Sequence, residues 1–179
     1  MKKELKNISK YLSFILRHKP ETIGLELNAN GWAAIDDLIT KTTSMSLTKE
    51  LIQLVVENND KQRFAIDSSN KLIRAHQGHS IGIDLNLKPI EPPKYLFHGT
   101  AECFERSILI NGLNKQKRHH VHLTESKAIA KSTAQRHGKA ILFKISSQKM
   151  HQCGYQFYQT TNSVWLVNEV PAKFMLKII

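Results

Sequence analysis

A cluster of prolines at the middle of the chain constrains its folding most. Pro89, Pro92 and Pro93 lie in the segment 86–94, which has neither a helical nor a strand periodicity. Proline fixes φ and lacks a backbone N–H, so this segment favours a stiff connector over a helix or a central strand. The sequence therefore predicts two lobes, residues 1–88 and residues 95–179, joined by a connector over 89–94.

Hydrophobic periodicity in the first lobe predicts three helices followed by a hairpin. Apolar residues recur at three- and four-residue steps near the N-terminus, as in an amphipathic helix: Leu5, Ile8, Leu12, Ile15 and Leu16. Further helices are expected over 35–40 and from about Thr48, a possible N-cap, and two strands flank a turn at 68–70. This order is typical of a winged helix, which binds nucleic acid or protein.

The second lobe alternates strands and helices, and its second half is mostly β. A helix ending at Gly112 has an apolar face that includes Phe104, Ile108 and Leu109. Another, closed by Gly138, is expected over 126–137. Strands are expected over 95–100, 118–124, 140–145, 156–160, 164–167 and 174–179. The whole chain is therefore predicted to be an α+β protein.

Three histidines and an arginine gather in the segment 118–122. If this segment is a strand, alternate side chains share a face, so that Arg118, His120 and His122 point the same way. Such a face suits a polyanionic ligand, such as a phosphate or a dinucleotide. A solvated polar strand and a His-x-His metal site are the alternatives that this segment leaves open.

The charge balance favours an anionic partner. Residues 1–90 hold 13 Lys and Arg against 10 Asp and Glu, and residues 91–179 hold 13 against 5, so most of the net charge of +11 lies in the second half. Nucleic acid is the commonest partner of so basic a chain. The sequence has no apolar run of the roughly 18 residues that a membrane span needs, and no signal-peptide pattern, so an intracellular protein is expected.

Several other residues have both a structural and a functional interpretation. Arg17 and His18 end the first helix, where cations suit the helix dipole and where both could also face a ligand. The segment 77–80 places a glycine among polar donors, which fits either a turn or a backbone approach to phosphate. Cys103 and Cys153 are too few for a disulfide framework or a zinc site and are expected to be buried as small apolar residues.

Seven segments, in order, resemble the NAD-dependent RNA 2′-phosphotransferases, named for removing the splice-junction 2′-phosphate of tRNA: Leu12–His18, Gly31-Trp32, Arg63-Phe64, Ile73–Ser80, His98–Thr100, Arg118–Leu123 and Val164–Leu166. The resemblance implies a winged-helix RNA-binding lobe and an NAD-binding lobe with the ADP-ribosyltransferase fold. It implies attack of the RNA 2′-phosphate on the nicotinamide ribose C1″, which expels nicotinamide. The ribose O2″ then attacks phosphorus, giving 2′-OH RNA and ADP-ribose 1″,2″-cyclic phosphate, without a metal.

The resemblance also assigns residues. The family's essential Arg-His-Arg-Arg set corresponds to Arg17, His18, Arg63 and Arg118. Arginine forks can hold the non-bridging oxygens of a phosphate, and electrostatic positioning usually carries phosphoryl transfer. The segments matching the NAD site give these candidates: Gln77, Gly78, His79, Ser80, His98, Gly99, Thr100, His120, His122 and Val164. The backbone at Gly99 is expected to meet the nicotinamide amide.

The chain departs from the family pattern at three positions. His76 stands where the family has Asn, Ser163 where it has Gly, and Thr124 where it has Ser. Ser163 is expected to strain a turn, because Gly tolerates positive φ far better. The alternatives are ADP-ribosylation of terminal nucleic-acid phosphates, a non-catalytic winged-helix nucleic-acid binder, and a metal-dependent phosphoesterase at His120 and His122. A cytoplasmic monomer acting on tRNA-like RNA is expected.

Overall fold

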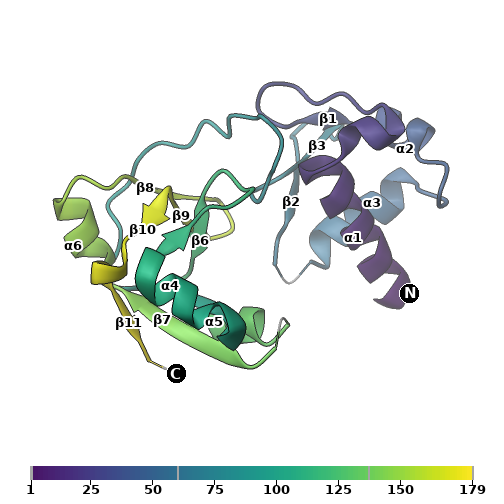
Figure 1. Cartoon of the computed structure of the whole chain (residues 1–179). Coiled ribbons are helices and arrows are strands. Elements are labelled where there is room, and N and C mark those ends of the chain that lie inside the picture. Colours follow the sequence, from purple (N-terminus) through teal and green to yellow (C-terminus); the bar gives the residue numbers. More distant parts are fainter. Residues whose placement is uncertain (1, 60, 137, 179) are drawn as a thin grey trace. The chain divides into compact units, whose positions relative to one another are not determined.

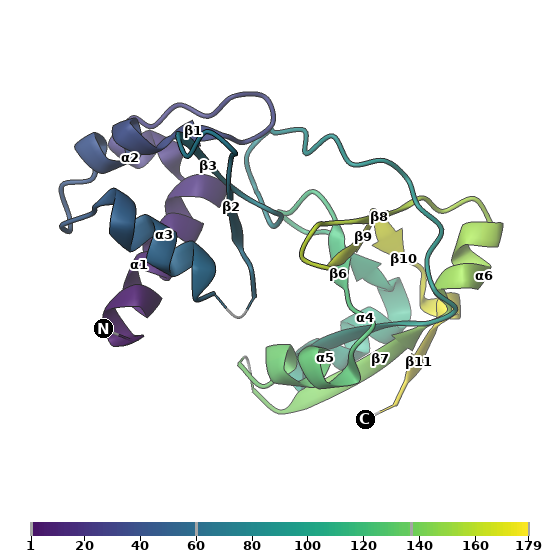
Figure 2. The same cartoon turned by 180° about the vertical axis from the view of Figure 1, so that it is seen from behind.

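The computed structural model describes residues 2–59, 61–136 and 138–178, and the chain divides into two compact units. The first ends at Asn86 and the second begins at Leu87. Both units combine helices with small antiparallel sheets (Figures 1 and 2), which confirms the α+β class. None of the described helices is long and apolar enough to span a membrane.

The first unit contains the three predicted helices and the predicted hairpin. The helices are α1 (Lys2–Arg17), α2 (Ile35–Lys41) and α3 (Lys49–Glu57), with a 3-10 turn η1 (Pro20–Ile23) after α1. The Thr48 hydroxyl accepts a hydrogen bond from the Leu51 N–H and caps α3, as predicted. The hairpin strands are β2 (Phe64–Ile66) and β3 (Leu72–Ala75). The short strand β1 (Ala33–Ala34), which was not predicted, completes an antiparallel sheet of order β1-β3-β2.

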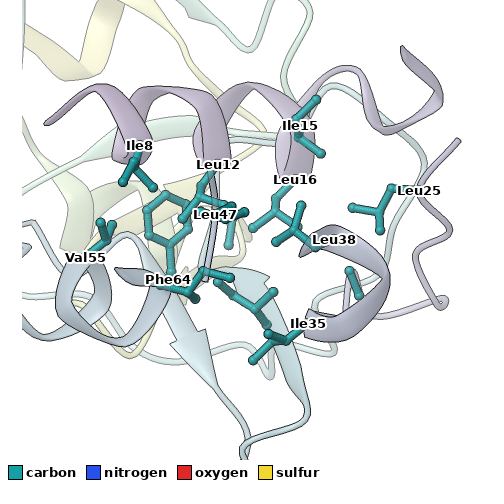
Figure 3. Close-up of a cluster of buried hydrophobic side chains, with 14 residues drawn as sticks. Ile8, Leu12, Ile15, Leu16, Leu25, Ile35, Leu38, Leu47, Val55 and Phe64 are labelled. Carbon is teal, nitrogen blue, oxygen red and sulfur yellow. The ribbon is translucent and has the colours of Figure 1, made fainter. Parts of the chain in front are cut away.

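One hydrophobic core holds the helices of the first unit against the inner face of this sheet. Leu12, Leu16 and Leu38 are completely buried, and Phe64 reaches the same core from β2 (Figure 3). The apolar stripe of α1 that the periodicity predicted is therefore the face that this core buries. This packing fixes the C-terminal end of α1, where Arg17 lies.

The second unit is built on two three-stranded antiparallel sheets. The first has the order β11-β7-β4, from Met175–Lys177, Ala140–Ile145 and Leu96–Ala101, and the second has the order β6-β9-β8, from Val121–Leu123, Trp165–Val167 and Phe157–Gln159. Phe97 and Thr124 exchange both backbone hydrogen bonds, at 2.7 and 3.0 Å, and so join β4 to the C-terminal end of β6 in the second sheet. Strands β5 (Leu113–Asn114) and β10 (Glu169–Val170) form a further antiparallel pair, which contributes Leu113 and Val170 to the hydrophobic core of this unit.

The sheets share a core, and helix α5 covers the opposite face of β4. Phe143, Phe157 and Leu96 are fully buried between the strands. Helix α5 (Lys127–Ala134), capped by the Ser126 hydroxyl, lies along β4 and β7 (Figure 2). The remaining helical segments are η2 (Glu102–Phe104), α4 (Glu105–Asn111), α6 (Ser147–Gln152) and η3 (Ala172–Phe174).

Three sequence-based expectations about elements are corrected. The histidine strand begins only at Val121, because residues 116–120 form a turn and a bend after β5. Helix α5 is shorter than the predicted 126–137, and His137 lies outside the described residues. Helix α6 was not predicted, because its six residues are mostly polar and too few to show a helical period.

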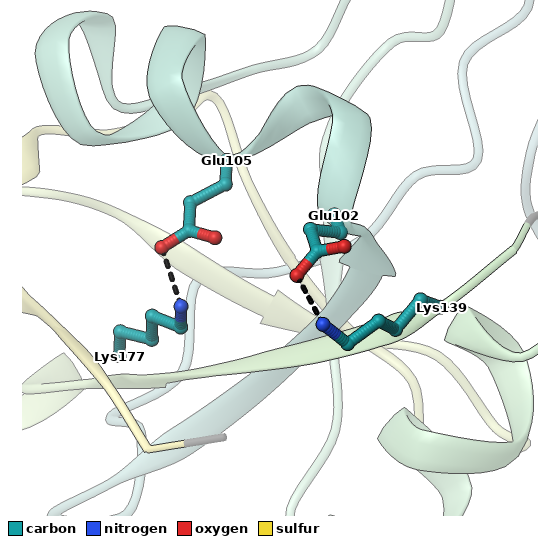
Figure 4. A network of polar contacts seen from close by, with 4 residues as sticks. All are labelled: Glu102, Glu105, Lys139 and Lys177. Carbon is teal, nitrogen blue, oxygen red and sulfur yellow. Dashed lines mark hydrogen bonds and ion pairs between the residues drawn. The ribbon is translucent and has the colours of Figure 1, made fainter.

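The helix before Gly112 buries much less of its apolar face than predicted. Ile108 packs against the core, but Phe104 is 54% exposed and Leu109 is 49% exposed. Two ion pairs hold this segment to the sheet instead, Glu102 with Lys139 at 2.6 Å and Glu105 with Lys177 at 2.5 Å (Figure 4).

Both cysteines are free and exposed, contrary to expectation. Cys103 lies in η2 and Cys153 at the C-cap of α6, outside the core.

The proline segment is bonded to the second unit. The Ile90 N–H donates to the Phe157 carbonyl at 2.8 Å, and the Ser147 hydroxyl donates to the Pro93 carbonyl at 2.6 Å. These bonds fix the path of the chain into β4, the strand that carries His98, Gly99 and Thr100.

Candidate functional site

The C-terminal end of α1 is bonded to the loop after β3. The Ser80 N–H donates to the Arg17 carbonyl at 2.9 Å, and the Ser80 hydroxyl lies 2.9 Å from His18 Nδ1. The helix leaves carbonyls without intrahelical partners at this end, and Ser80 occupies one of them. Residues separated by 62 positions are thereby joined, and the His18 ring is held by a side chain as well as by the helix.

The Arg17 guanidinium lies against Gly78. A Cβ built on Gly78 would lie 3.6 Å from Arg17 Nη1, and Gly78 has φ +90°, a conformation that L-residues rarely adopt. The guanidinium carbon also lies 5.9 Å from the centroid of the Phe64 ring. A larger residue at position 78 would be strained by this positive φ, although its Cβ would make only ordinary contact with the arginine.

Arg63 is oriented by Asn59, a residue that the sequence analysis passed over. Arg63 Nη1 donates to Asn59 Oδ1 at 2.8 Å, while the Asn59 side-chain NH₂ donates to the Ser9 hydroxyl on α1 at 3.2 Å. Asn59 is only 8% exposed. Its position in the polar run that ends α3 gave no signal of this role, which depends on a contact with Arg63 just before β2.

His76 lies among the cations of the first unit. The His76 backbone N–H donates to the Arg63 carbonyl at 2.9 Å, next to the β2–β3 pairing. Burial lowers the pKa of His76, and the charges of Arg74 and Arg17 lower it further. The ring therefore stays neutral at neutral pH, and the positive charge here resides on the arginines. This is the position at which the chain departs from the family's Asn.

The segment 77–80 is divided between two environments. Gly78 and Ser80 contact Arg17 and His18, as described above. His79 is 1% exposed, and a Cβ built on Gly31 would lie 3.6 Å from its Nε2 atom. Gln77 is half-buried. His79 is thus placed inside the first unit beside the Gly31 turn, whereas Gly78 and Ser80 lie against Arg17 and His18.

In the second unit, His98 of β4 is tied to β6. Its Nδ1 lies 3.0 Å from the His122 carbonyl oxygen. Because a carbonyl only accepts, Nδ1 carries the proton and Nε2 presents a lone pair. Burial lowers the pKa of His98; the bond to His122 opposes this, and the Arg118 charge adds to the lowering. His98 is therefore a neutral acceptor fixed at one edge of the sheet.

The second sheet presents a row of candidate side chains on the face opposite its core. His122 pairs with Leu166, and Leu166 pairs with Tyr158, so these three side chains share that face. The His120 ring centroid lies 5.6 Å from that of Tyr158. Burial lowers the pKa of His120, as do His119 and Lys115. Tyr158 was not predicted, although its place in an alternating strand segment was the available signal.

Arg118 lies outside strand β6, so strand alternation does not place its side chain in this row, contrary to the prediction from the sequence. It lies in the bend before β6, is exposed, and donates its N–H to the Lys115 carbonyl at 3.0 Å. It belongs to the second unit, whereas Arg17, His18 and Arg63 belong to the first.

Gly99, Thr100 and Val164 have clear structural surroundings. A Cβ on Gly99 would lie 2.0 Å from the Ala130 carbonyl oxygen, so glycine is required for α5 to lie on β4. Thr100 pairs with Ile141 on the opposite face. Val164 closes a tight loop with Thr160, in which Ser163 has φ +59°. Ser163 thus has the positive φ for which the sequence analysis expected strain.

Each unit offers one kind of chemistry. The first gathers Arg17, His18, Arg63 and Arg74, which suit a phosphate dianion. The second presents the neutral imidazole of His98 and the His122 row, which suit hydroxyl and amide groups. Among the described residues no group of three His, Cys, Asp or Glu could hold a metal ion. An open depression of about 480 Å³ beside α4 contains none of the candidate residues.

Comparison with known proteins gives a consistent result over nearly the whole chain. Residues 2–169 match the family model described as RNA 2′-phosphotransferase, Tpt1 / KptA family. A "Probable RNA 2′-phosphotransferase" of Nostoc punctiforme is 48% identical over 176 residues, which cover 97% of each chain. Proteins with the same name from Acaryochloris marina and Flavobacterium johnsoniae are also 48% identical, over 99% and 95% of this chain and 99% and 94% of their own.

Proposed function

The chain belongs to the RNA 2′-phosphotransferase, Tpt1 / KptA family, and we propose that it removes an internal 2′-phosphate from RNA by transferring it to NAD. The products are RNA with a free 2′-OH, nicotinamide and ADP-ribose 1″,2″-cyclic phosphate. The observation that carries the proposal is the family match over residues 2–169, together with the presence of every residue of the Arg-His-Arg-Arg set. The substrate is a tRNA-like RNA, and the enzyme acts as a cytoplasmic monomer.

Arg17, His18, Arg63 and Arg118 handle the phosphate in this proposal. Arg17 is supported by its place at the end of α1, where its carbonyl accepts from the Ser80 N–H, and Arg63 by its bond to Asn59, which fixes the fork. Each charge-assisted bond from a guanidinium to a phosphate oxygen contributes roughly 1.5–3 kcal/mol. His18, held by Ser80, donates to the phosphate or exchanges a proton with it.

NAD binding is assigned to the second unit and to the segment 77–80. NAD supplies the ribose carbon that accepts the phosphate. The residues of this chain bind and orient the dinucleotide: His98 accepts a hydrogen bond from a ribose hydroxyl through Nε2, and the His122 face, with His120, Thr100 and Val164, contacts the rest. The imidazoles of His98 and His120 fit such a ligand, because burial lowers the pKa of each and favours the neutral ring.

We further propose that the first unit is a winged-helix RNA-binding lobe and the second an ADP-ribosyltransferase-like lobe. Three helices followed by a three-stranded antiparallel sheet support the first assignment. The resemblance of the segments 98–100, 118–123 and 164–166 supports the second.

The test is a single incubation. An RNA with one internal 2′-phosphate is mixed with the protein in EDTA, with and without NAD, and both RNA and nucleotide products are separated. NAD-dependent loss of the phosphate with formation of the cyclic phosphate is expected. An ADP-ribose group that stays on the RNA would indicate ADP-ribosylation only. RNA binding without any conversion would refute the proposal in favour of a non-catalytic binder.

The proposed roles of Arg63 and Arg118 are tested by measuring how much of the reaction intermediate accumulates when each is replaced. If Arg63 and Arg118 act mainly when the phosphate is transferred to the ribose O2″, then Arg63→Ala and Arg118→Ala should accumulate RNA-2′-phospho-ADP-ribose. Electrostatic stabilisation of the developing charge is what these variants remove. Lys10→Gln, an exposed position on α1, is the matched loss of one positive charge. Normal product release from both alanine variants, with no intermediate, would contradict the assignment.

A further inference from the structure

The outer face of the β1-β3-β2 sheet carries an arginine that the proposed chemistry does not use. Arg74 lies on β3 between Ile73 and Ala75, which are buried in the core, so its side chain points to the opposite face. Its guanidinium carbon lies 4.6 Å from the centroid of the Trp32 ring. The register Ala33–Ile73 and Ala34–Leu72 places Trp32 directly across from Arg74, so the pair is a cross-strand neighbour contact.

Trp32 is firmly held in this position. The Trp32 backbone N–H donates to Asn28 Oδ1 at 3.0 Å, and the Trp32 carbonyl accepts from the Asn28 backbone N–H at 2.9 Å. Gly31 before it has φ +79°, and a Cβ there would lie 2.8 Å from Ile83 Cδ1. Because the positive φ of Gly31 favours glycine in this turn, the backbone fixes where the indole lies, and the indole in turn restrains the arginine by a cation–π contact.

Arg74 is a partly desolvated cation without an anionic partner in the described chain. No ion pair or hydrogen bond joins its side chain to another described residue, and its buried Nε atom has no acceptor. Burial lowers the pKa of Arg74, but a guanidinium stays charged at any working pH. A buried donor left unsatisfied costs free energy, so such a group favours an external anion.

Arg74 lies near residues of the proposed phosphate site. The charges of both Arg74 and Arg17 act on the His76 ring, and His76 is bonded to the backbone of Arg63. Arg74 thus adds a cation near His76, beyond the residues that serve the 2′-phosphate. In RNA the nearest further anion is a phosphodiester of the same strand, and arginine binds such a group bidentately.

We propose that Arg74, oriented by Trp32, binds a backbone phosphate of the RNA substrate beside the nucleotide that carries the 2′-phosphate. This inference rests on the proposed function for the identity of the ligand. Arg74 acts as an RNA-binding residue, and Trp32 acts through it as a positioning residue. The pair therefore helps to select a 2′-phosphate within a polynucleotide over an isolated nucleotide 2′-phosphate.

The test measures binding before turnover. The Kd of an RNA with one internal 2′-phosphate is measured without NAD, over a series of salt concentrations, for the wild type and for Arg74→Gln, Arg74→Lys, Trp32→Leu and Lys10→Gln. Arg74→Gln should weaken binding about 10- to 100-fold, the equivalent of one charge-assisted contact. Because one phosphate contact is lost, the slope of log K against log salt should fall in magnitude by about 0.7.

The other variants separate charge from geometry. Trp32→Leu should weaken binding while keeping most of the salt slope, because the charge remains but is no longer held in place. Arg74→Lys should keep the slope with intermediate affinity, and it guards against misfolding of the glutamine variant. Lys10→Gln should leave affinity and slope close to those of the wild type. A thermal melt of each variant accompanies the titrations.

Several results would overturn the inference. An Arg74→Gln protein that binds RNA with wild-type affinity and slope shows that the pair is structural. A changed KM for NAD with unchanged RNA affinity shows that Arg74 serves the dinucleotide. An equal loss of RNA affinity in Lys10→Gln shows that the effect depends on net charge and not on a specific contact of Arg74. Failure of the wild type to convert the RNA would refute the proposed function separately, because RNA binding is measured without NAD.

Discussion

Gly99→Ala tests whether the glycine of β4 is required by packing as well as by the proposed NAD site. The added Cβ would lie 2.0 Å from the Ala130 carbonyl oxygen and 2.6 Å from its carbon, both in the backbone of α5. Ordinary contact begins at 3.4 Å, so the helix would have to retreat by about 1.4 Å. Backbone cannot rotate away as a side-chain end can, so α5 must move as a body or leave the sheet.

The cost follows from what α5 buries. Ala130 is 2% exposed and Ala134 is completely buried, and Ala130 packs with Phe97 and Leu142 in a small cluster. Overpacking of this kind costs about 1–3 kcal/mol. For a domain of this size each kcal/mol lowers Tm by about 4–8 °C. Gly99 does not have a positive φ, so backbone conformation adds nothing to this cost and the effect is steric.

Thermal unfolding followed by circular dichroism and calorimetry, without NAD, measures the effect. Gly82→Ala is the matched control, because nothing lies within 4 Å of a Cβ there and its φ is not positive. We expect a clear fall in the Tm of the second unit for Gly99→Ala and a change within about 0.5 kcal/mol for Gly82→Ala. An unchanged Tm for Gly99→Ala together with lost use of NAD would refute the packing argument and leave the glycine a purely ligand-facing role.

Three further predictions concern the Asn59–Arg63 hydrogen bond, the backbone of Ser163 and the pKa of His98. Asn59→Ala removes the acceptor that orients Arg63, so RNA-2′-phospho-ADP-ribose should accumulate, less than in Arg63→Ala; normal turnover would show that the bond is dispensable. Ser163→Gly should raise the free energy of unfolding by up to about 1 kcal/mol in denaturant titrations, because it relieves φ +59°, and a loss of stability would contradict the strain. The folded-state pKa of His98 is lowered, chiefly by burial, so its stabilising effect is complete above the unfolded value of 6.5 and is lost as pH falls through the folded pKa. His98→Gln should therefore flatten the decline in stability as pH falls below 6.5, and an unchanged decline would assign it to other groups.

The sequence by itself determined the elements whose signals are local. Apolar residues at helical spacing predicted α1, α2 and α3, Thr48 predicted the start of α3, and a turn between two strand-like runs predicted the β2–β3 hairpin. These signals depend on residues a few positions apart, so a single sequence carries them completely. The positive φ of Ser163 was likewise predictable, because the family pattern has a glycine there.

The tertiary structure alone decided which distant residues meet. Ser80 contacts His18, Asn59 orients Arg63, Trp32 lies across from Arg74, and His98 is bonded to the His122 backbone. Sheet register and helix packing set these contacts, and neither leaves a periodic mark in the sequence. For the same reason the sequence misjudged the exposed cysteines and the apolar face of α4, since burial depends on what a neighbouring element covers. Local pattern and the family resemblance thus supplied the candidate side chains, and long-range packing gave several of them their partners.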